Sequence, residues 1–218
     1  VVAVVSLGVG STSISFDSVA IAVARRTPII SELVKSIEVS GVEEVIVVEY
    51  RLPRVVLGWF VGASLAAAGA LFQGIFRNPM ADPYVIGVSA GAGLGAAVSI
   101  LLGLSLAPGV SATPVIAFAF ALATVYVVYN IARVGSTAPP TTLLLSGIAV
   151  SIFLSSIIMF LEVVAGERLH AIVFWLMGGL WAASWSDVYA TAPLFLAGLL
   201  VSMLYARDLN IMLSLIHI

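Results

Sequence analysis

Two arginines, in the sequence Arg51-Leu-Pro-Arg54, stand directly before a long uncharged stretch. A guanidinium group is permanently charged and presents paired N–H donors, so two of them could bind the carboxylates of a partner. The alternative is that both anchor the mouth of an apolar helix, with their charged ends in the water. Spacing alone favours anchoring, and Pro53 suits the first turn of a helix that begins here.

A second polar group lies between two uncharged stretches, in a segment with two prolines. Its members are Gln73, Arg77, Asn78, Pro79, Asp82 and Pro83. Asn78 and Asp82 have short side chains that cap helix ends, and the prolines restrict the backbone. This composition predicts a rigid turn between two helices.

Other groups that could do chemistry are scarce. Cysteine is absent, which excludes a thiolate metal site, and the two histidines, His170 and His217, are far apart. No apolar stretch long enough to span a membrane contains a pair of acidic residues, and Glu162 lies at the end of one such stretch. Ionisable groups inside a membrane usually mark ion or proton paths. Their absence argues against a proton-coupled carrier, a membrane protease and a metal channel, and we expect no bound metal.

Glycines alternate at Gly91, Gly93 and Gly95. A nucleotide-binding loop would need the spacing G-x-G-x-x-G after a strand, or a lysine after the glycines, and neither is present. In lipid, small residues let helix backbones approach closely. The three glycines, like the pattern Gly58-x-x-x-Gly62, therefore predict closely packed helices.

The composition decides the class of protein. Hydrophobic residues make up 61% of the 218 residues and charged residues 9%, whereas soluble domains carry roughly 25% charged residues. So few charges cannot cover a water-facing surface, which excludes a soluble domain and a disordered tail. The net charge of −2 offers no basic surface for nucleic acid. We predict an all-α protein, a polytopic bundle of helices in a lipid bilayer.

The charges are concentrated near the start of the chain. The chain has nine basic and eleven acidic residues. Residues 17–54 contain eleven of these charged residues, and residues 55–218 contain the other nine. This distribution predicts one aqueous segment before the membrane region.

Three local structures are expected within this aqueous segment. Asp17 or Ser18 could cap a short helix over Val19–Arg25. Ser31–Ile37 is predicted to form another helical turn, and Val45–Val48 to be extended.

Five apolar stretches, each with at most one charged residue, are long enough to span a membrane, which takes about 20 residues. They cover residues 55–76, 84–106, 114–132, 141–164 and 188–206. Pro108-Gly109 and Pro114 separate the second stretch from the third, and Pro139-Pro140 precede the fourth.

The segment Gly166–Asp187 differs from these spans. It contains three of the four tryptophans of the chain, and tryptophan prefers the membrane–water interface. We expect a short helix and a loop at the interface, with a break at Gly178-Gly179 and with His170 as an interfacial residue.

These residues resemble a known family. Residues 51–97 are closely similar to permease subunits of ABC importers for iron–siderophores, haem and cobalamin, the FecCD family. The matching blocks are Arg51–Arg54, Gly62–Gln73, Arg77–Ala92, Leu144–Ala149, Trp175–Leu180 and Leu209-Asn210, with Met80 and Ile86 as departures. The resemblance extends from about Leu7 to Met212.

The resemblance implies an ABC importer permease of the type II fold in the cell membrane. It implies a second permease subunit, two cytoplasmic ATPase subunits and an external binding protein as partners. The permease itself would be no enzyme and would bind no cofactor. The cargo would be an iron–siderophore, haem or cobalamin.

The resemblance also implies roles for single residues. Arg51 and Arg54 would pair with acidic residues of the binding protein. The helix at 141–164 would line the route between the two permeases, with Ser146, Gly147 and Ser151 as candidate lining residues.

The implied orientation places residues 10–54 and 165–187 outside. A count of basic residues disagrees, with three inside (Arg77, Arg133 and Arg207) and six outside, although cytoplasmic loops usually carry the excess. The orientation implied by the family is preferred, because two of the six outside basic residues, Arg51 and Arg54, have the implied role of pairing with the binding protein.

The family pattern further implies that residues 1–212 are the N-terminal part of a single permease domain, with about six of ten helices. Residues 1–9 would end the first helix, 10–54 form the external segment, and 55–206 hold five spans with the interfacial 166–187. Residues 213–218 are interpreted as a non-native tail.

Two other functions stay open, a secondary transporter and a membrane remnant without a transport role. A buried carboxylate or an inverted repeat would favour the transporter.

Overall fold

The computed structural model of the protein describes residues 2–10, 12–26, 40–107 and 110–214. It divides into two compact units. The first comprises Val1–Ala67 and Leu180–Leu204, and the second comprises Ala68–Gly179 and Tyr205–Ile218. Two long helices, α5 (Leu52–Phe76) and α10 (Trp185–Ser214), contribute residues to both units.

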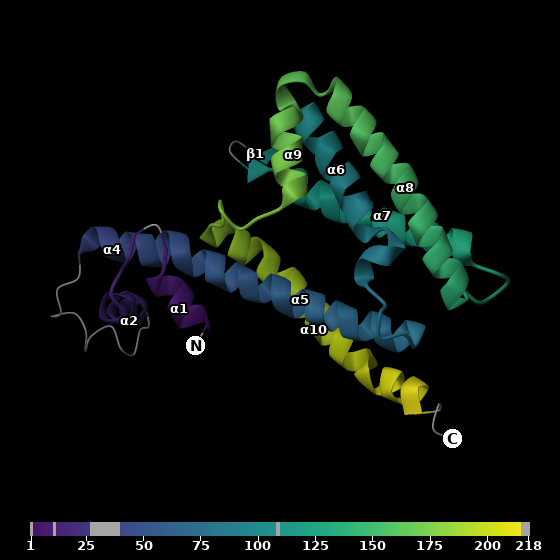
Figure 1. Cartoon of the computed structure of the whole chain (residues 1–218), viewed down its shortest axis with the longest axis horizontal. Coiled ribbons are helices and arrows are strands. Elements are labelled where there is room, and N and C mark those ends of the chain that lie inside the picture. The colour runs from purple at the N-terminus through teal and green to yellow at the C-terminus, as the bar shows by residue number, and fades with distance from the viewer. Residues whose placement is uncertain (1, 11, 27–39, 108–109, 215–218) are drawn as a thin grey trace. The chain divides into compact units, whose positions relative to one another are not determined.

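The first unit contains the charged segment and the start of α5 (Figure 1). The helices before α5 are α1 (Val2–Gly8), α2 (Phe16–Arg25), α4 (Gly41–Val45) and the π-helix η1 (Ile46–Arg51). One cluster of buried apolar side chains joins α1, α2 and η1: Leu7, Ile14, Val19, Ala22, Val47 and Val48. Helices this short are marginal alone, so burial in the shared cluster holds them in place.

The helix predicted over Val19–Arg25 is present as α2, but its predicted cap is wrong. The hydroxyl oxygen of Ser15 accepts a hydrogen bond from the backbone N–H of Ser18. Because the helix begins at Phe16, both expected capping residues, Asp17 and Ser18, lie inside it.

The prediction of an extended Val45–Val48 is also wrong. α4 and η1 run through this segment and continue into α5. Val47 and Val48 are buried in the cluster of the first unit, so tertiary packing outweighs the preference of valine for strands. The turn predicted over Ser31–Ile37 lies outside the described residues.

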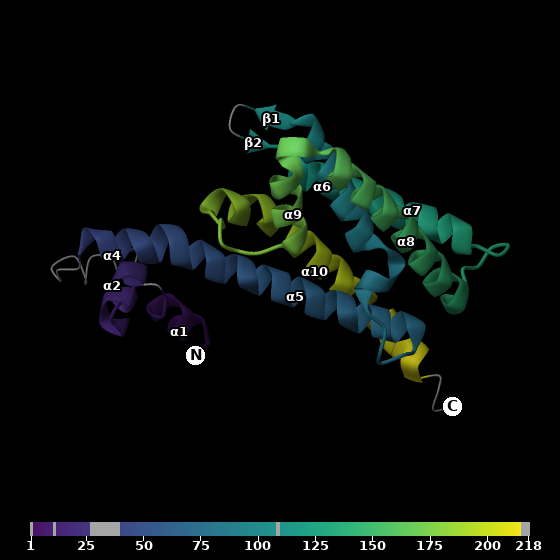
Figure 2. The ribbon, with the colours of Figure 1, turned by 45° about the horizontal axis from the view of Figure 1, so that its top comes forward.

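The second unit is built around three helices, α6, α7 and α8 (Figures 1 and 2). Its elements between α5 and α10 are the 3₁₀ helix η2 (Pro83–Ile86), α6 (Val88–Leu102), β1 (Ser105–Ala107), β2 (Val110–Ser111), α7 (Thr113–Ala132), α8 (Pro140–Val164), the 3₁₀ helix η3 (Gly166–Arg168) and α9 (Leu169–Met177). The two strands pair antiparallel and connect α6 to α7. α6 packs against both α7 and α8.

Four helices among the described residues are long and apolar enough to cross a membrane. They are Gly41–Phe76, Thr113–Ala132, Pro140–Val164 and Trp185–Ile211. These four confirm the spans predicted at 55–76, 114–132, 141–164 and 188–206 as apolar helices of membrane length.

The predicted span 84–106 is wrong in its length. Its residues form η2 and then α6, which has 15 residues. Two glycines in the left-handed region bound α6, Gly87 with φ 82° and Gly103 with φ 65°, a conformation that ends helices and favours glycine. At 1.5 Å per residue, such a helix is about 22 Å long, shorter than the roughly 30 Å of the hydrocarbon core.

The small residues of α6 pack against neighbouring helices, as predicted. A Cβ on Gly95 would lie 2.8 Å from the Cβ of Phe120 in α7, and one on Gly93 would lie 3.0 Å from the Cδ2 of Leu176 in α9. These glycines therefore allow a close approach of the helices. On α5 the outcome differs, because a Cβ on Gly62 would meet no atom of the described structure within 4 Å.

α9 is the short helix predicted between Gly166 and Asp187. It ends at Met177 and is followed by Gly178, whose φ is 70°, so the predicted break is confirmed. The interfacial position of this segment stays a prediction. So does the non-native tail 213–218, because residues 215–218 lie outside the described residues.

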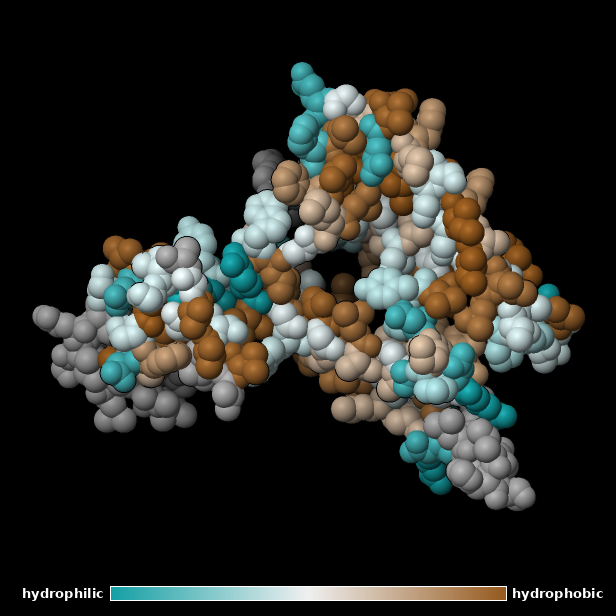
Figure 3. Space-filling model, in the orientation of Figure 1, coloured by the Kyte–Doolittle hydropathy of each residue, from teal (hydrophilic) through white to brown (hydrophobic). Residues whose placement is uncertain are grey.

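Apolar side chains of α8 face outward. Of the 18 most apolar consecutive residues of α8, only 6% are buried. Figure 3 shows brown, hydrophobic residues along α8. Phe153, Met159 and Val163 are all exposed. A surface this apolar has to be covered by lipid or by another protein surface, which is the behaviour of a polytopic membrane bundle.

Candidate functional site

Arg51, the last residue of η1, is half-buried and binds the backbone near the start of the chain. Its guanidinium group donates to the carbonyl oxygen of Leu7 at 2.7 Å and to that of Thr12. Leu7 lies at the end of α1, where carbonyl groups lack partners within the helix. Gly10 makes room for the contact, since a Cβ there would lie 2.7 Å from Nη2 of Arg51.

Arg54, in the first turn of α5, is exposed and binds a different loop. Its Nε donates to the carbonyl oxygen of Leu180 at 2.9 Å, and its Nη2 donates to that of Trp181 at 2.7 Å. Arg51 thus binds the end of α1 and the loop before α2, and Arg54 binds the loop before α10.

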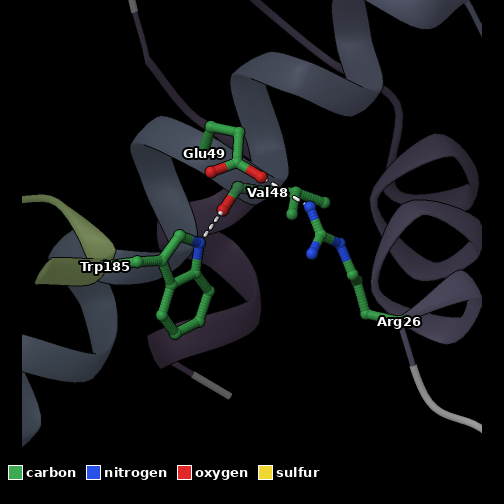
Figure 4. Close-up of polar contacts among 4 residues, drawn as sticks. All are labelled: Arg26, Val48, Glu49 and Trp185. Carbon is green, nitrogen blue, oxygen red and sulfur yellow. Dashed lines mark hydrogen bonds and ion pairs between the residues drawn. The ribbon is translucent and has the colours of Figure 1, made fainter. Parts of the chain in front are cut away.

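Trp185 adds a third contact at this place (Figure 4). Its indole Nε1 donates to the carbonyl oxygen of Val48 at 2.9 Å. Next to Val48, Glu49 forms an ion pair with Arg26 at 2.5 Å. Both partners of that pair are largely exposed, with 62% of the Arg26 side chain and 43% of the Glu49 side chain accessible, so its contribution to stability is small.

We call Arg51, Arg54 and Trp185 the donor cluster. The motif identified the arginines from the sequence, but no signal pointed to Trp185 or to the carbonyl groups that these side chains bind. A guanidinium group has five N–H donors, and each arginine uses two in the hydrogen bonds described. Donors therefore remain for a carboxylate, and docking to a binding protein stays a prediction.

The polar turn is held by short hydrogen bonds of its own. Asp82 Oδ1 accepts from the backbone N–H of Tyr84 at 2.8 Å and caps η2, where Pro83 occupies the first turn. Asn78 Oδ1 accepts from the N–H of Met80 at 2.9 Å.

Two further residues of the turn adjoin these bonds. The backbone N–H of Asn78 donates to the carbonyl oxygen of Gln73 at 3.2 Å. Arg77 has a φ of 48°, which is uncommon for a residue other than glycine. Pro79 follows in the loop, and the described contacts tie the segment to the end of α5.

The candidate lining residues lie on α8, and two of them share a face. Gly147 is buried beside the backbone of Val85 and Ile86. Ser151, one turn later, donates from Oγ to the carbonyl oxygen of Gly147 at 2.7 Å. Ser146 is half-buried. The lining role stays a prediction for all three residues, and in this conformation η2 covers Gly147.

Metal binding finds no support in the part of the chain that the structure describes. It contains no group of three or more His, Cys, Asp or Glu side chains that could hold an ion. The arrangement instead offers hydrogen-bond donors at one end of α5 and closely packed apolar helices.

Comparison with known proteins decides the family. The model of the FecCD transport family matches residues 1–214. This chain belongs to the FecCD transport family. Its helices and its family together make it a multi-pass membrane protein of a transport family.

Curated proteins that are similar to this chain are named as permeases of import or transport systems. The cobalamin import system permease protein BtuC of Halobacterium salinarum is 46% identical over 171 residues, which cover 78% of this chain and 46% of the relative. The Fe(3+) dicitrate transport system permease protein FecD of Escherichia coli is 38% identical over 167 residues, which cover 77% of this chain and 51% of the relative. The chain spans about half the length of the curated relatives it matches.

A solved structure agrees with the family fold. It is described as an inward-facing conformation of a metal-chelate type ABC transporter. The match has a TM-score of 0.76 and 29% sequence identity, and it covers 96% of this chain and 60% of the other. The predicted fold class, an ABC importer permease built of helices, is therefore confirmed over the residues compared.

Proposed function

We propose that this chain is part of the membrane permease of an ATP-driven importer whose substrate is a metal chelate, either cobalamin or a ferric complex. The observation that carries the proposal is the family match over residues 1–214. Relatives named for cobalamin, ferric citrate and hemin support the substrate class. Under this proposal the permease catalyses no reaction and binds no cofactor, and ATP hydrolysis belongs to a separate subunit.

The proposed assembly contains a second permease subunit, two cytoplasmic ATPase subunits and an external binding protein, in the cell membrane. The exposed apolar faces of α8 and α10 support a protein that is covered by lipid and by further helices. ATP would bias the assembly between outward-open and inward-open states, since a ligand shifts an equilibrium only through its different affinity for the two states.

Arg51 and Arg54 are proposed as the docking residues for the binding protein. Each guanidinium group is held by two backbone carbonyl groups, so little side-chain freedom remains to be lost when a carboxylate binds. Charge-assisted hydrogen bonds to carboxylates are roughly twice as strong as neutral ones. Ser146 is proposed to face the route at another stage of the cycle, when the helices have moved.

The docking proposal is tested with the double variant Arg51→Glu and Arg54→Glu in a binding-protein pull-down. We expect loss of the complex, because attraction to the partner's carboxylates becomes repulsion. Arg207→Glu is the matched control, since its position is predicted at the opposite, cytoplasmic end. Replacing the facing acidic residues of the binding protein by arginine should restore the complex, and unchanged docking of the double variant would remove the role.

The transport proposal is tested by uptake into cells that lack their own permease. The full-length gene is expressed with the neighbouring ATPase and binding-protein genes, and labelled cobalamin, ferric citrate and haem are offered in turn. We expect accumulation of one of them, lost when the ATPase is inactivated. Absence of uptake for every chelate, with all subunits present in the membrane, would contradict the proposal.

A further inference from the structure

A contact between α8 and the backbone before α6 admits only glycine on the α8 side. A Cβ on Gly147 would lie 2.7 Å from the Cα of Ile86 and closer still to the carbonyl oxygen of Val85. Side-chain carbons essentially never approach other atoms this closely. The opposing atoms belong to the backbone and cannot rotate away, so α8 has a socket at Gly147 into which η2 fits.

The same face of α8 makes a second close contact one turn later. Gly87 has a φ of 82°, and a Cβ there would lie 3.1 Å from the Oγ of Ser151 and 3.3 Å from the Cγ2 of Thr124. Ser151 in turn bonds the carbonyl oxygen of Gly147, which fixes its hydroxyl on this face. The backbone of residues 85–87 therefore sits against α8 at two consecutive turns.

Apolar side chains extend this contact to the polar turn. Phe76, Ala81 and Ile86 form a buried cluster. Leu143 and Leu144 of α8 pack against that cluster. The turn before η2 is thus joined to the first turns of α8 by packing as well as by the socket.

The turn has few ways to bend between its two ends. Asp82 caps η2, and Asn78 bonds the N–H of Met80. The backbone N–H of Ala81 donates to the carbonyl oxygen of Asn78 at 3.0 Å. A displacement of η2 would consequently be transmitted to the whole turn.

We propose that Gly147 is a positioning residue, the socket that makes the polar turn 77–87 and the first half of α8 move as one body. The rigid connection between the turn and α8 is argued only from packing within the second unit. The part that this rigid body plays in transport depends on the proposed function.

The test measures a distance by electron spin resonance between labels on Met80→Cys and Leu145→Cys. Both side chains are largely exposed, at 85% and 68%, and the printed sequence contains no cysteine that would take up a label. The full-length permease, with the two labels on only one of its two permease subunits, is reconstituted in nanodiscs with its ATPase, and the distance is recorded without nucleotide and with ATP. We expect one narrow distance that is the same in both conditions.

Gly147→Ala should shift and broaden that distance, because the added methyl group expels the backbone of Val85 from the socket. Gly62→Ala is the matched control, since a Cβ there meets no atom of the described structure within 4 Å. If Gly147→Ala does not fold, Ser151→Ala, which removes one hydroxyl from the contact, should broaden the distance to a smaller extent.

Two results would overturn the proposal. One is a distance in the unaltered protein that changes with ATP, and the other is an unchanged distance in a folded Gly147→Ala variant. Uptake is measured on the same samples. A permease that keeps a narrow distance but transports no chelate would refute the proposed function and leave the socket standing.

Discussion

At the scale of single residues, the donor cluster connects chain segments that are remote in sequence. Arg51 binds a carbonyl group 44 residues away, and Trp185 binds one 137 residues away. A sequence pattern can mark the arginines, because they stand in a motif. It cannot predict their carbonyl partners, because backbone groups carry no residue-specific signal and their positions depend on the folded chain.

Trp185→Phe tests the cluster at this scale. The ring stacks on Tyr189 and phenylalanine can keep that contact, but the Nε1–H donor to Val48 is lost. A part-buried carbonyl group without its partner costs on the order of 1 kcal/mol, so thermal unfolding in detergent should begin at a lower temperature. Trp59→Phe is the control, because its exposed indole has no hydrogen bond within the described part of the chain. Equal losses in the two variants would count against the cluster.

At the scale of the elements, uncharged length predicted four helices of membrane length. It failed at α6, where left-handed glycines, and not charges, set the ends. A separate prediction, an extended Val45–Val48, is wrong because Val47 and Val48 are buried with residues of α1 and α2 and lie in a helix. Neither effect is visible in a window of sequence, because a glycine's φ and a side chain's burial are decided by residues elsewhere in the chain.

Gly95→Ala tests the close packing of α6. The new methyl group would lie 2.8 Å from the Cβ of Phe120 and 2.9 Å from the carbonyl oxygen of Ile116, and overpacking of this kind costs about 1–3 kcal/mol. Gly62→Ala should be neutral or stabilising, because alanine favours helix over glycine by about 1 kcal/mol. The apparent melting temperatures of the two variants are compared. Equal stability of the Gly95→Ala and Gly62→Ala proteins would refute the close packing of α6 against α7.

Arg168→Met tests how the end of α6 is fixed. Its Nη1 donates to the carbonyl oxygens of Ile100 and Leu101 at 2.9 and 2.6 Å, in the last turn of the helix, where carbonyl groups have fewer backbone partners. The carbonyl oxygen of Ile100 also accepts from the backbone N–H of Gly103 at 3.1 Å. Because Arg168 is exposed, water replaces part of the loss, and about 1 kcal/mol is expected. Faster amide exchange at residues 103–105 should report the change, with Arg207→Met as the control. Unchanged exchange would show that Gly103 alone ends the helix.

At the scale of the whole molecule, the composition predicted a membrane bundle and the motif blocks predicted its family. The cargo could not be predicted from either. Relatives are named for cobalamin, ferric citrate, hemin and molybdate, although all of them are similar to this chain in sequence. The described residues contain no group of three or more His, Cys, Asp or Glu side chains that could hold an ion and so distinguish one of these cargoes from another.

The central claim is ATP-driven import through this permease, and uptake into proteoliposomes tests it most directly. The purified full-length permease, its ATPase and its binding protein are reconstituted, and accumulation of labelled chelate is measured with and without ATP, each time with and without an ionophore that collapses ion gradients. We predict accumulation that requires ATP and the binding protein together. Accumulation that continues without ATP and disappears with the ionophore would contradict the account, because a secondary transporter behaves in that way.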